Sequence, residues 1–159
     1  MSGDTMSARF RLVALDTAAD AERQAAMTIR SFVSSRPAPV LGLATGRTMI
    51  PVYAWLVEWH RREKLTLAGC TSFNLDEYCG LPPDHPSSFA SYMRRHLFDH
   101  VDMPPDRWHM PPHDAGAQAY DDLIRRNGGI GLQLRGLGRN GHIGFNEPGS
   151  SRHSRTRRV

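Results

Sequence analysis

The chain has 159 residues, of which 40% are hydrophobic and 23% charged, as in one globular domain and unlike a disordered tail. Its formal charge of +4 would suit an acidic partner such as nucleic acid. However, residues 150–159 contain four arginines and no acid, which leaves 16 basic and 16 acidic residues in the rest. We therefore expect a solvated terminus there and no nucleic-acid partner, although a short arginine-rich end can also bind phosphate.

Other classes of protein are excluded by simple patterns. No apolar run approaches the roughly 18–20 residues of a membrane span, and the N-terminus MSGDTMSARF lacks the apolar region of a signal peptide. Cys70 and Cys79 are too far apart for a Cys-x-x-Cys motif and too few for a disulfide framework. We therefore expect a reduced, cytoplasmic protein with no membrane partner.

The first half of the chain alternates between strand and helix patterns. Alternating apolar residues predict a short strand over residues 10–14. Helical spacing of apolar residues predicts an amphipathic helix over 18–33, with Thr17 as its N-cap. The apolar run 40–44 is typical of a strand buried on both faces, and residues 51–62 predict the next helix.

The second half continues the alternation. We predict a strand over residues 66–74, a helix over 87–98 with Ser87 as its N-cap, and a proline-rich loop over 104–112. A helix over 118–126 and a strand over 130–137 follow. This order predicts an α/β fold, a Rossmann-like parallel sheet with helices on both faces.

Ligands of open parallel sheets bind at the carboxyl ends of the strands. Three polar clusters fall at such ends, at residues 45–48, 74–78 and 136–147. These clusters are the candidate functional regions.

The first cluster consists of Thr45, Gly46, Arg47 and Thr48, between a buried strand and a helix. Two hydroxyls, an arginine and the amides of a helix N-terminus suit a phosphate group. It is not a Walker A loop, because no Gly-Lys-Ser/Thr follows at the required spacing. The alternative is a plain turn in which threonine caps the helix.

The third cluster begins with Gly136-Leu137-Gly138-Arg139-Asn140-Gly141, which matches the dinucleotide-binding pattern G-x-G-x-x-G. The context contradicts that match. The glycines follow a late strand, Pro148 and Gly149 prevent a long helix, and no acidic residue lies about 20 positions further on. We predict no dinucleotide site.

Two groups of acid–base residues remain. His142 and Glu147, with Asn140 beside them, suit general acid–base chemistry, in which a carboxylate sets the tautomer of the imidazole. The alternative is a hydrogen-bonded loop histidine. Asp76 and Glu77 can move a proton or hold a metal, but paired acids also cap helices.

A metal site is not predicted. His96 and His100 have a spacing of four that suits chelation, but no third ligand lies at a recognisable spacing. Surface histidines are the expected outcome.

Three blocks together resemble the signature blocks of glucosamine-6-phosphate deaminases. They are residues 41–46 (LGLATG), 73–78 (FNLDEY) and 138–148 (GRNGHIGFNEP), and their order and spacing match as well. Residues 154–156 (SRT) resemble the next block of that family. The related 6-phosphogluconolactonases share the fold but end the 138–148 loop differently.

The resemblance implies a cofactor-free conversion of glucosamine 6-phosphate to fructose 6-phosphate and ammonia. Asp76 would move a proton between C2 and C1, and His142 would open the pyranose ring. Glu147 and Asn140 would orient His142, and residues 45–48 would hold the phosphate. The alternative is a truncated, inactive relative that binds a sugar phosphate without turning it over.

The sequence departs from the family pattern in three ways. Asn140 stands where some members carry Asp, and an amide cannot accept a proton as a carboxylate does. Arg47 replaces a small residue and would either add a phosphate contact or crowd the turn. Members are also longer, so we expect residues 1–159 to be one incomplete domain that lacks the last strands and helices. Some members form hexamers, which leaves a homo-oligomer open.

Overall fold

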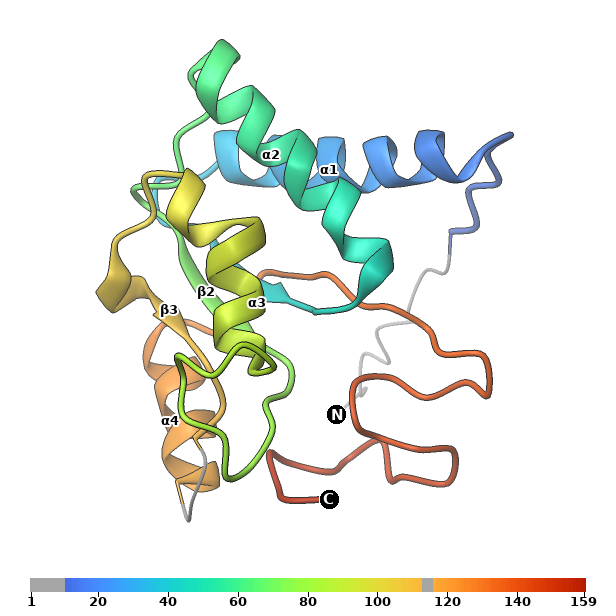
Figure 1. Ribbon diagram of the computed structural model, residues 1–159, viewed down its shortest axis with the longest axis vertical. Helices are drawn as coiled ribbons and strands as arrows, with labels where there is room; N and C mark the ends of the chain where they lie inside the picture. Colours follow the sequence, from blue (N-terminus) through green and yellow to red (C-terminus); the bar gives the residue numbers. More distant parts are fainter. Residues whose placement is uncertain (1–10, 113–115) are drawn as a thin grey trace, which may run out of the picture.

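A parallel sheet flanked by helices forms the centre of the protein (Figure 1). The computed structural model describes residues 11–112 and 116–159, and the statements below concern those residues. In chain order the helices and strands are α1 (Ala18–Ser34), β1 (Val40–Leu43), α2 (Ile50–Glu63), β2 (Thr71–Asn74), α3 (Phe89–His96), β3 (Trp108–His109), α4 (Ala117–Arg126) and β4 (Leu132–Gln133). Three 3-10 helices lie between them, at Arg47–Met49 (η1), Phe98–His100 (η2) and Pro105–Arg107 (η3).

The strands lie in the order β3-β2-β1-β4, and each neighbouring pair is parallel. Leu43 of β1 is paired with Asn74 of β2, and Gly42 is paired with Gln133 of β4. Along the chain, β2 and β3 are therefore added on one side of β1, and β4 is then added on its other side. Such a reversal of strand order is where open α/β sheets bind their ligands.

Helices cover both faces of the sheet. On one face, Leu41 and Leu43 belong to the main hydrophobic core, together with residues of α2 and α3. On the other face, the ring of Phe73 contacts Tyr120 of α4 edge-on, with centroids 5.7 Å apart. Phe73 is paired with Gly42, whose neighbours Leu41 and Leu43 point to the opposite side, because side chains alternate along a strand.

Helix α1 packs along α2, and its start is well defined. The Thr17 hydroxyl accepts a hydrogen bond from the Asp20 amide at 3.1 Å, as expected of an N-cap. Arg30 of α1 lies over the Trp59 ring of α2, 5.0 Å from its centroid, and also pairs with Glu63 at 2.7 Å. The guanidinium of the arginine thereby covers an aromatic ring at the helix interface, in a cation–π contact.

Most of the predicted elements are confirmed. The α/β class with a parallel sheet is present, and α1, α2 and α4 begin and end within one residue of their predicted bounds. Helix α3 is shorter than predicted: Ser88, rather than Ser87, is its N-cap, and the helix ends at His96 before η2.

Three strand predictions and one loop prediction are wrong in whole or part. Residues 11–15 form no strand, and Phe10 lies outside the described residues. Residues 66–70 turn instead of extending, because the Asp102 carboxylate accepts hydrogen bonds from the Thr66 hydroxyl and the Leu67 amide, both at 2.6 Å. The predicted loop 104–112 contains η3 and the edge strand β3. The predicted strand 130–137 is reduced to β4.

In the described part of the chain, no helix is long and apolar enough to cross a lipid bilayer.

Removal of a core side chain measures how much the sheet–helix packing stabilises the fold. Leu41→Ala is expected to lower the free energy of unfolding by about 2–5 kcal/mol, because it leaves a cavity between β1 and the helices. Leu41 is 1% exposed, whereas Leu12 is 79% exposed, so Leu12→Ala is the matched control and is expected to change stability by less than about 0.5 kcal/mol. Urea unfolding followed by circular dichroism measures both, and equal losses would contradict this packing.

Candidate active site

The carboxyl ends of three neighbouring strands bring the three polar clusters together. Thr45 lies two residues after Leu43, the end of β1, and Asp76 lies two residues after Asn74, the end of β2. Leu43 and Asn74 are paired directly in the sheet. Residues 138–149, here called the histidine loop, follow β4 on the other side of β1. A Cβ added at Gly144 would nevertheless lie 3.0 Å from Asp76 Oδ2. The histidine loop therefore passes beyond the end of β1 to reach Asp76.

The 45–48 turn leads directly into a helix. Gly46 has φ 115° and ψ 161°, a conformation that favours glycine, and η1 begins at the next residue and continues into α2. Neither η1 nor α2 has a side-chain cap, so the interpretation of this turn as threonine capping is wrong. The hydroxyls of Thr45 and Thr48 and the first amides of η1 are therefore not used for capping. Arg47 is exposed and does not crowd the turn.

The two adjacent acids after β2 have different surroundings. Glu77 is buried, and its carboxylate accepts hydrogen bonds from the backbone amides of Tyr78, Phe89 and Ala90, each at 2.8 Å. Phe89 and Ala90 are the first residues of α3, where the helix dipole favours a negative charge. The capping interpretation of the acidic pair is therefore correct for Glu77.

Asp76 is half-buried beside the histidine loop. Burial and, secondarily, the neighbouring Glu77 carboxylate raise the pKa of Asp76 from its ordinary 3.8 to about 6. Both causes disfavour the charged form. A carboxyl with a pKa near 6 is largely ionised at neutral pH, yet it is basic enough to take a proton from carbon next to a carbonyl.

His142 belongs to a short relay with an amide and a carboxylate. Its Nδ1 lies 2.7 Å from Asn140 Oδ1, and Asn140 Nδ2 donates to Glu147 Oε2 at 2.7 Å. Because an amide oxygen only accepts, Nδ1 must carry the proton, and Nε2 of the neutral ring keeps its lone pair. Glu147 Oε1 is 3.9 Å from Nδ1, so the carboxylate also lies close to the ring.

The backbone of the histidine loop fits closely around the imidazole. A Cβ at Gly138 would lie 2.3–2.5 Å from the His142 ring, so only glycine leaves room for the ring in this position. The Gly138 amide also donates to the His142 carbonyl at 2.9 Å. The ring remains accessible, with 42% of the side chain exposed.

Three aromatic rings attach the histidine loop to the start of α3. The Phe145 ring centroid lies 5.1 Å from that of Tyr78 and 5.7 Å from that of Phe89, and the latter two are 4.7 Å apart. Aromatic pairs at these separations contribute beyond their buried area. This cluster and the Gly144 contact hold the loop against Asp76.

Comparison with known proteins places the chain in a family. The family model described as glucosamine-6-phosphate isomerases/6-phosphogluconolactonase matches residues 14–157. The chain belongs to this family. A glucosamine-6-phosphate deaminase of Hahella chejuensis is 45% identical over 152 residues, which are 93% of this chain and 58% of that protein. The chain thus spans a little over half the length of this relative, and the family resemblance of the sequence blocks is confirmed.

Solved structures of the family share the fold described above. A monomeric glucosamine-6-phosphate deaminase superposes with a TM-score of 0.88 at 38% identity, over 92% of this chain and 63% of that one. A 6-phosphogluconolactonase of Thermotoga maritima superposes with a TM-score of 0.67 at 21% identity, over 85% of this chain and 62% of that one. The second likeness shows the shared fold alone.

Within this family fold, three tyrosines join helices to the strand ends, and the motif analysis did not single them out. The hydroxyl of Tyr53 on α2 donates to the Ala44 carbonyl, and that of Tyr92 on α3 donates to the Gly46 carbonyl at 2.7 Å. Tyr120 on α4 donates to the carbonyls of Asn74 and His109 at 2.8 and 3.1 Å. The hydroxyl of a tyrosine on the buried face of a helix needs a hydrogen-bond acceptor. The position of these tyrosines on predicted helix faces is the one signal by which the sequence could have indicated such contacts.

The arginine-rich end and the SRT block, residues 154–156, are attached to α4. The Thr156 hydroxyl donates to Asp121 Oδ1 at 2.5 Å, and Arg155 Nη1 lies 3.8 Å from Asp121 Oδ2. Arg155 and Arg157 are exposed, as expected of a solvated end.

Two further sequence patterns concern the glycines at residues 136–141 and possible metal ligands. In the described residues that follow the glycines at 136–141, no helix is present. Over residues 11–112 and 116–159, no three His, Cys, Asp or Glu side chains converge in a way that would hold a metal ion.

Substitution of Glu77 tests the difference between the two acids. Glu77→Gln is expected to destabilise the fold by about 1–3 kcal/mol, because a neutral amide caps α3 less strongly than a carboxylate. It is also expected to lower the pKa of Asp76, because a neighbouring negative charge is removed. Urea unfolding and a carboxyl NMR titration measure the two effects.

The control for this variant is Glu58→Gln, which removes only an exposed partner of Arg62 on α2. It is expected to change stability by less than about 0.5 kcal/mol and to leave the pKa of Asp76 unaltered. An unchanged Asp76 titration in Glu77→Gln would contradict the assigned cause.

Proposed function

We propose that this chain carries the catalytic site of a glucosamine-6-phosphate deaminase, a hydrolase of N-acetylglucosamine catabolism in the cytoplasm. Glucosamine 6-phosphate and water would become fructose 6-phosphate and ammonia. The observation that carries the proposal is the contact between Asp76, a half-buried carboxyl with raised pKa, and the loop that holds His142. Relatives that share these sequence blocks are named glucosamine-6-phosphate deaminases, as in Hahella chejuensis.

The 45–48 turn is the proposed site for the 6-phosphate. Two hydroxyls from Thr45 and Thr48, the Arg47 guanidinium and the first amides of η1 surround one turn at a helix N-terminus. The phosphate does not react. Its binding free energy therefore serves to position the sugar carbons over Asp76.

His142 is the proposed acid–base group for ring opening. Nε2 would take the proton from the anomeric hydroxyl and return it to the ring oxygen as the C1–O5 bond breaks, which leaves the open-chain aldehyde. Asn140 and Glu147 would hold the tautomer that has Nε2 unprotonated. The amide at Asn140 transmits orientation without accepting the proton, so Glu147 supplies the only negative charge of the relay.

Asp76 is the proposed base for isomerisation. Its carboxylate would remove the proton from C2, which is acidified by the aldehyde at C1, and the resulting enolamine would be protonated at C1. The C2 imine formed in this way reacts with water to give the ketone of fructose 6-phosphate and free ammonia. All atoms are supplied by substrate and water, and the proton on Asp76 is returned within the cycle.

The direct test is an assay of the purified chain with glucosamine 6-phosphate, in which both ammonia and fructose 6-phosphate are measured. Equal amounts of the two products above the background of Asp76→Asn would support the proposal. Absence of turnover, with the substrate still bound, would instead favour the second candidate below.

Asp76→Asn is also expected to stabilise the fold while it abolishes turnover. The pKa of Asp76 in the folded chain, about 6, exceeds its ordinary 3.8, so the ionised carboxyl opposes folding above pH 6. The cost fades as the pH falls from 6 to 4, because the folded state then takes up the proton first. The amide should therefore raise stability at pH 8 by up to about 3 kcal/mol, and by almost nothing at pH 4.

Melting temperatures of wild type and Asp76→Asn between pH 4 and 8 measure this effect. A stability difference that does not depend on pH would contradict the raised pKa. For the wild type, turnover is expected to decline as the pH falls through about 6, where Asp76 becomes protonated.

Displacement of His142 tests its role without touching the imidazole chemically. Gly138→Ala places a methyl group 2.3–2.5 Å from the ring, so the ring must move away from Asn140. Turnover is expected to fall by about 10²-fold or more. Gly136→Ala is the matched control, because its Cβ would meet only the end of Met49 at an ordinary 3.4 Å. A similar loss in both variants would refute the specific effect.

A second candidate function is a sugar-phosphate binder without turnover. Its supporting observation is the exposure of the histidine loop, in which 42% of the His142 and 66% of the Glu147 side chain are open to solvent. In such a site water competes with the relay for its hydrogen bonds. A melting temperature that rises with glucosamine 6-phosphate, with no ammonia released, would establish this function.

A further inference from the structure

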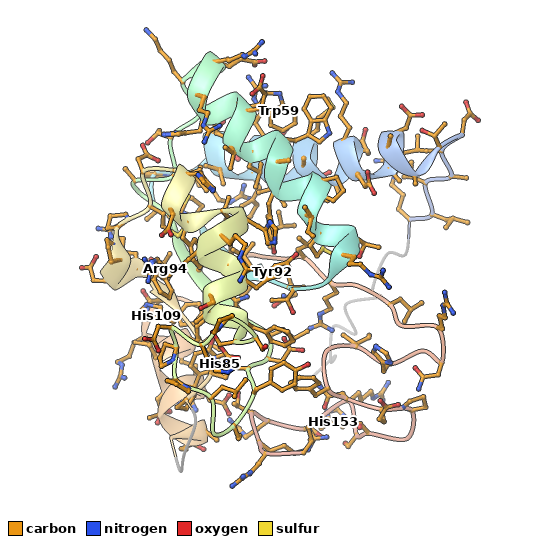
Figure 2. The ribbon with its side chains drawn as sticks, viewed as in Figure 1. Trp59, His85, Tyr92, Arg94, His109 and His153 are labelled. Carbon is orange, nitrogen blue, oxygen red and sulfur yellow. The ribbon has the colours of Figure 1, made fainter. Side chains whose placement is uncertain are left out.

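The carbonyl of Gly46 is held by two donors from different parts of the fold. The Met49 amide donates to it at 3.0 Å, which forms the first turn of η1. The hydroxyl of Tyr92, 46 residues away on α3, donates to it at 2.7 Å. Tyr92 is labelled on α3 in Figure 2. Within the described residues, the second bond is the one side-chain hydrogen bond made to the backbone of residues 45–48.

A fixed carbonyl determines the direction of the next amide. The Gly46 C=O and the Arg47 N–H belong to one planar trans peptide and point in opposite directions. Arg47 is the first residue of η1, so its amide has no acceptor within that helix. When the carbonyl points to Tyr92, the Arg47 amide must therefore point away from α3.

Without the Tyr92 hydroxyl, the Gly46 carbonyl keeps only the Met49 amide as a donor among the described residues. The Gly46 φ of 115° lies where glycine has several accessible conformations, and a Cβ built there would meet no atom within 4 Å. Gly46 therefore has no side chain that could anchor its peptide. The hydrogen bonds to its carbonyl are what restrict it.

The Tyr92 side chain is itself held in place by packing. Its ring lies against His96, with centroids 4.5 Å apart, on the helix that Glu77 caps. Burial raises the pKa of the Tyr92 hydroxyl to about 12, so the hydroxyl stays protonated and can donate throughout the physiological range.

We propose that Tyr92 is a positioning residue for phosphate, which holds the Gly46 peptide so that the Arg47 amide is directed at the bound anion. This inference rests on the proposed function, in which the 45–48 turn binds the 6-phosphate of the sugar. Tyr92 does not touch the substrate, and it acts through the backbone of the turn.

Tyr92→Phe removes the hydroxyl and keeps the ring. Titration calorimetry with inorganic phosphate and with glucosamine 6-phosphate, well below the melting temperature, is expected to show about three- to tenfold weaker binding of both, as for the loss of one hydrogen bond. If the chain turns over its substrate, KM should rise by the same factor with kcat within about twofold. A merely structural role would lower the melting temperature and leave the affinity of the folded protein unchanged.

Tyr120→Phe is the matched control. It also removes a tyrosine hydroxyl that donates from a helix to backbone carbonyls at the strand ends, but those carbonyls belong to Asn74 and His109. Phosphate affinity is expected to stay within about twofold of the wild type. An equal loss in both variants would overturn the proposal.

The outcomes separate this inference from the proposed function. If the wild type binds neither phosphate nor glucosamine 6-phosphate, the proposed function fails. If the wild type binds both and Tyr92→Phe binds them equally well, the role of Tyr92 fails alone. An NMR titration of the wild type with phosphate gives a readout that needs no variant: the Arg47 amide should shift most among residues 45–49, and an unaffected Arg47 amide would overturn the inference.

Discussion

The buried carboxylate of Glu77 is the contact on which the rest of the site depends. It accepts three backbone amides, one beside β2 and two at the start of α3, and so joins the end of a strand to the beginning of a helix. This connection fixes the direction of α3, which carries Tyr92 toward the 45–48 turn. It also places Phe89 where the histidine loop packs. The same charge contributes to the raised pKa of Asp76, so one structural carboxylate affects position and protonation together.

The two proposed acid–base groups, Asp76 and His142, differ in how they are held. Asp76 is half-buried between the sheet and the histidine loop, and desolvation controls its pKa. His142 stands on a mainly exposed loop and depends on local hydrogen bonds with Asn140 and, through it, Glu147. The environment of Asp76 changes its basicity, whereas the hydrogen bonds of His142 set the orientation of its ring. This division suits the proposed reaction, which needs a carboxylate of raised basicity at carbon and a well-directed donor and acceptor at oxygen.

Helices and central strands were predictable because their signals are local. The N-cap at Thr17, the helical spacing over α1 and α2, and the apolar run of β1 are all visible in consecutive residues. The failures concern elements that distant residues decide. Residues 66–70 turn because Asp102, 35 or 36 residues away, holds them, and β3 exists because β2 offers it an edge. Residues 11–15 have a strand pattern but pair with no strand in the described chain.

By itself, the sequence determined the α/β class and the family, and it singled out the candidate site residues, because motifs such as GHIGFNEP place those residues in contiguous blocks. The residue types alone left open which member of the Asp76–Glu77 pair is structural, although the family resemblance gave the proton transfer to Asp76. They also left open whether threonine caps the 45–48 turn. Only the tertiary structure decided these points. The amides that Glu77 accepts lie up to 13 residues away, and the hydroxyl that holds Gly46 comes from a helix 46 residues further along the chain. Such contacts arise only when the sheet brings its strand ends and helix starts to one edge, so no local pattern could specify them.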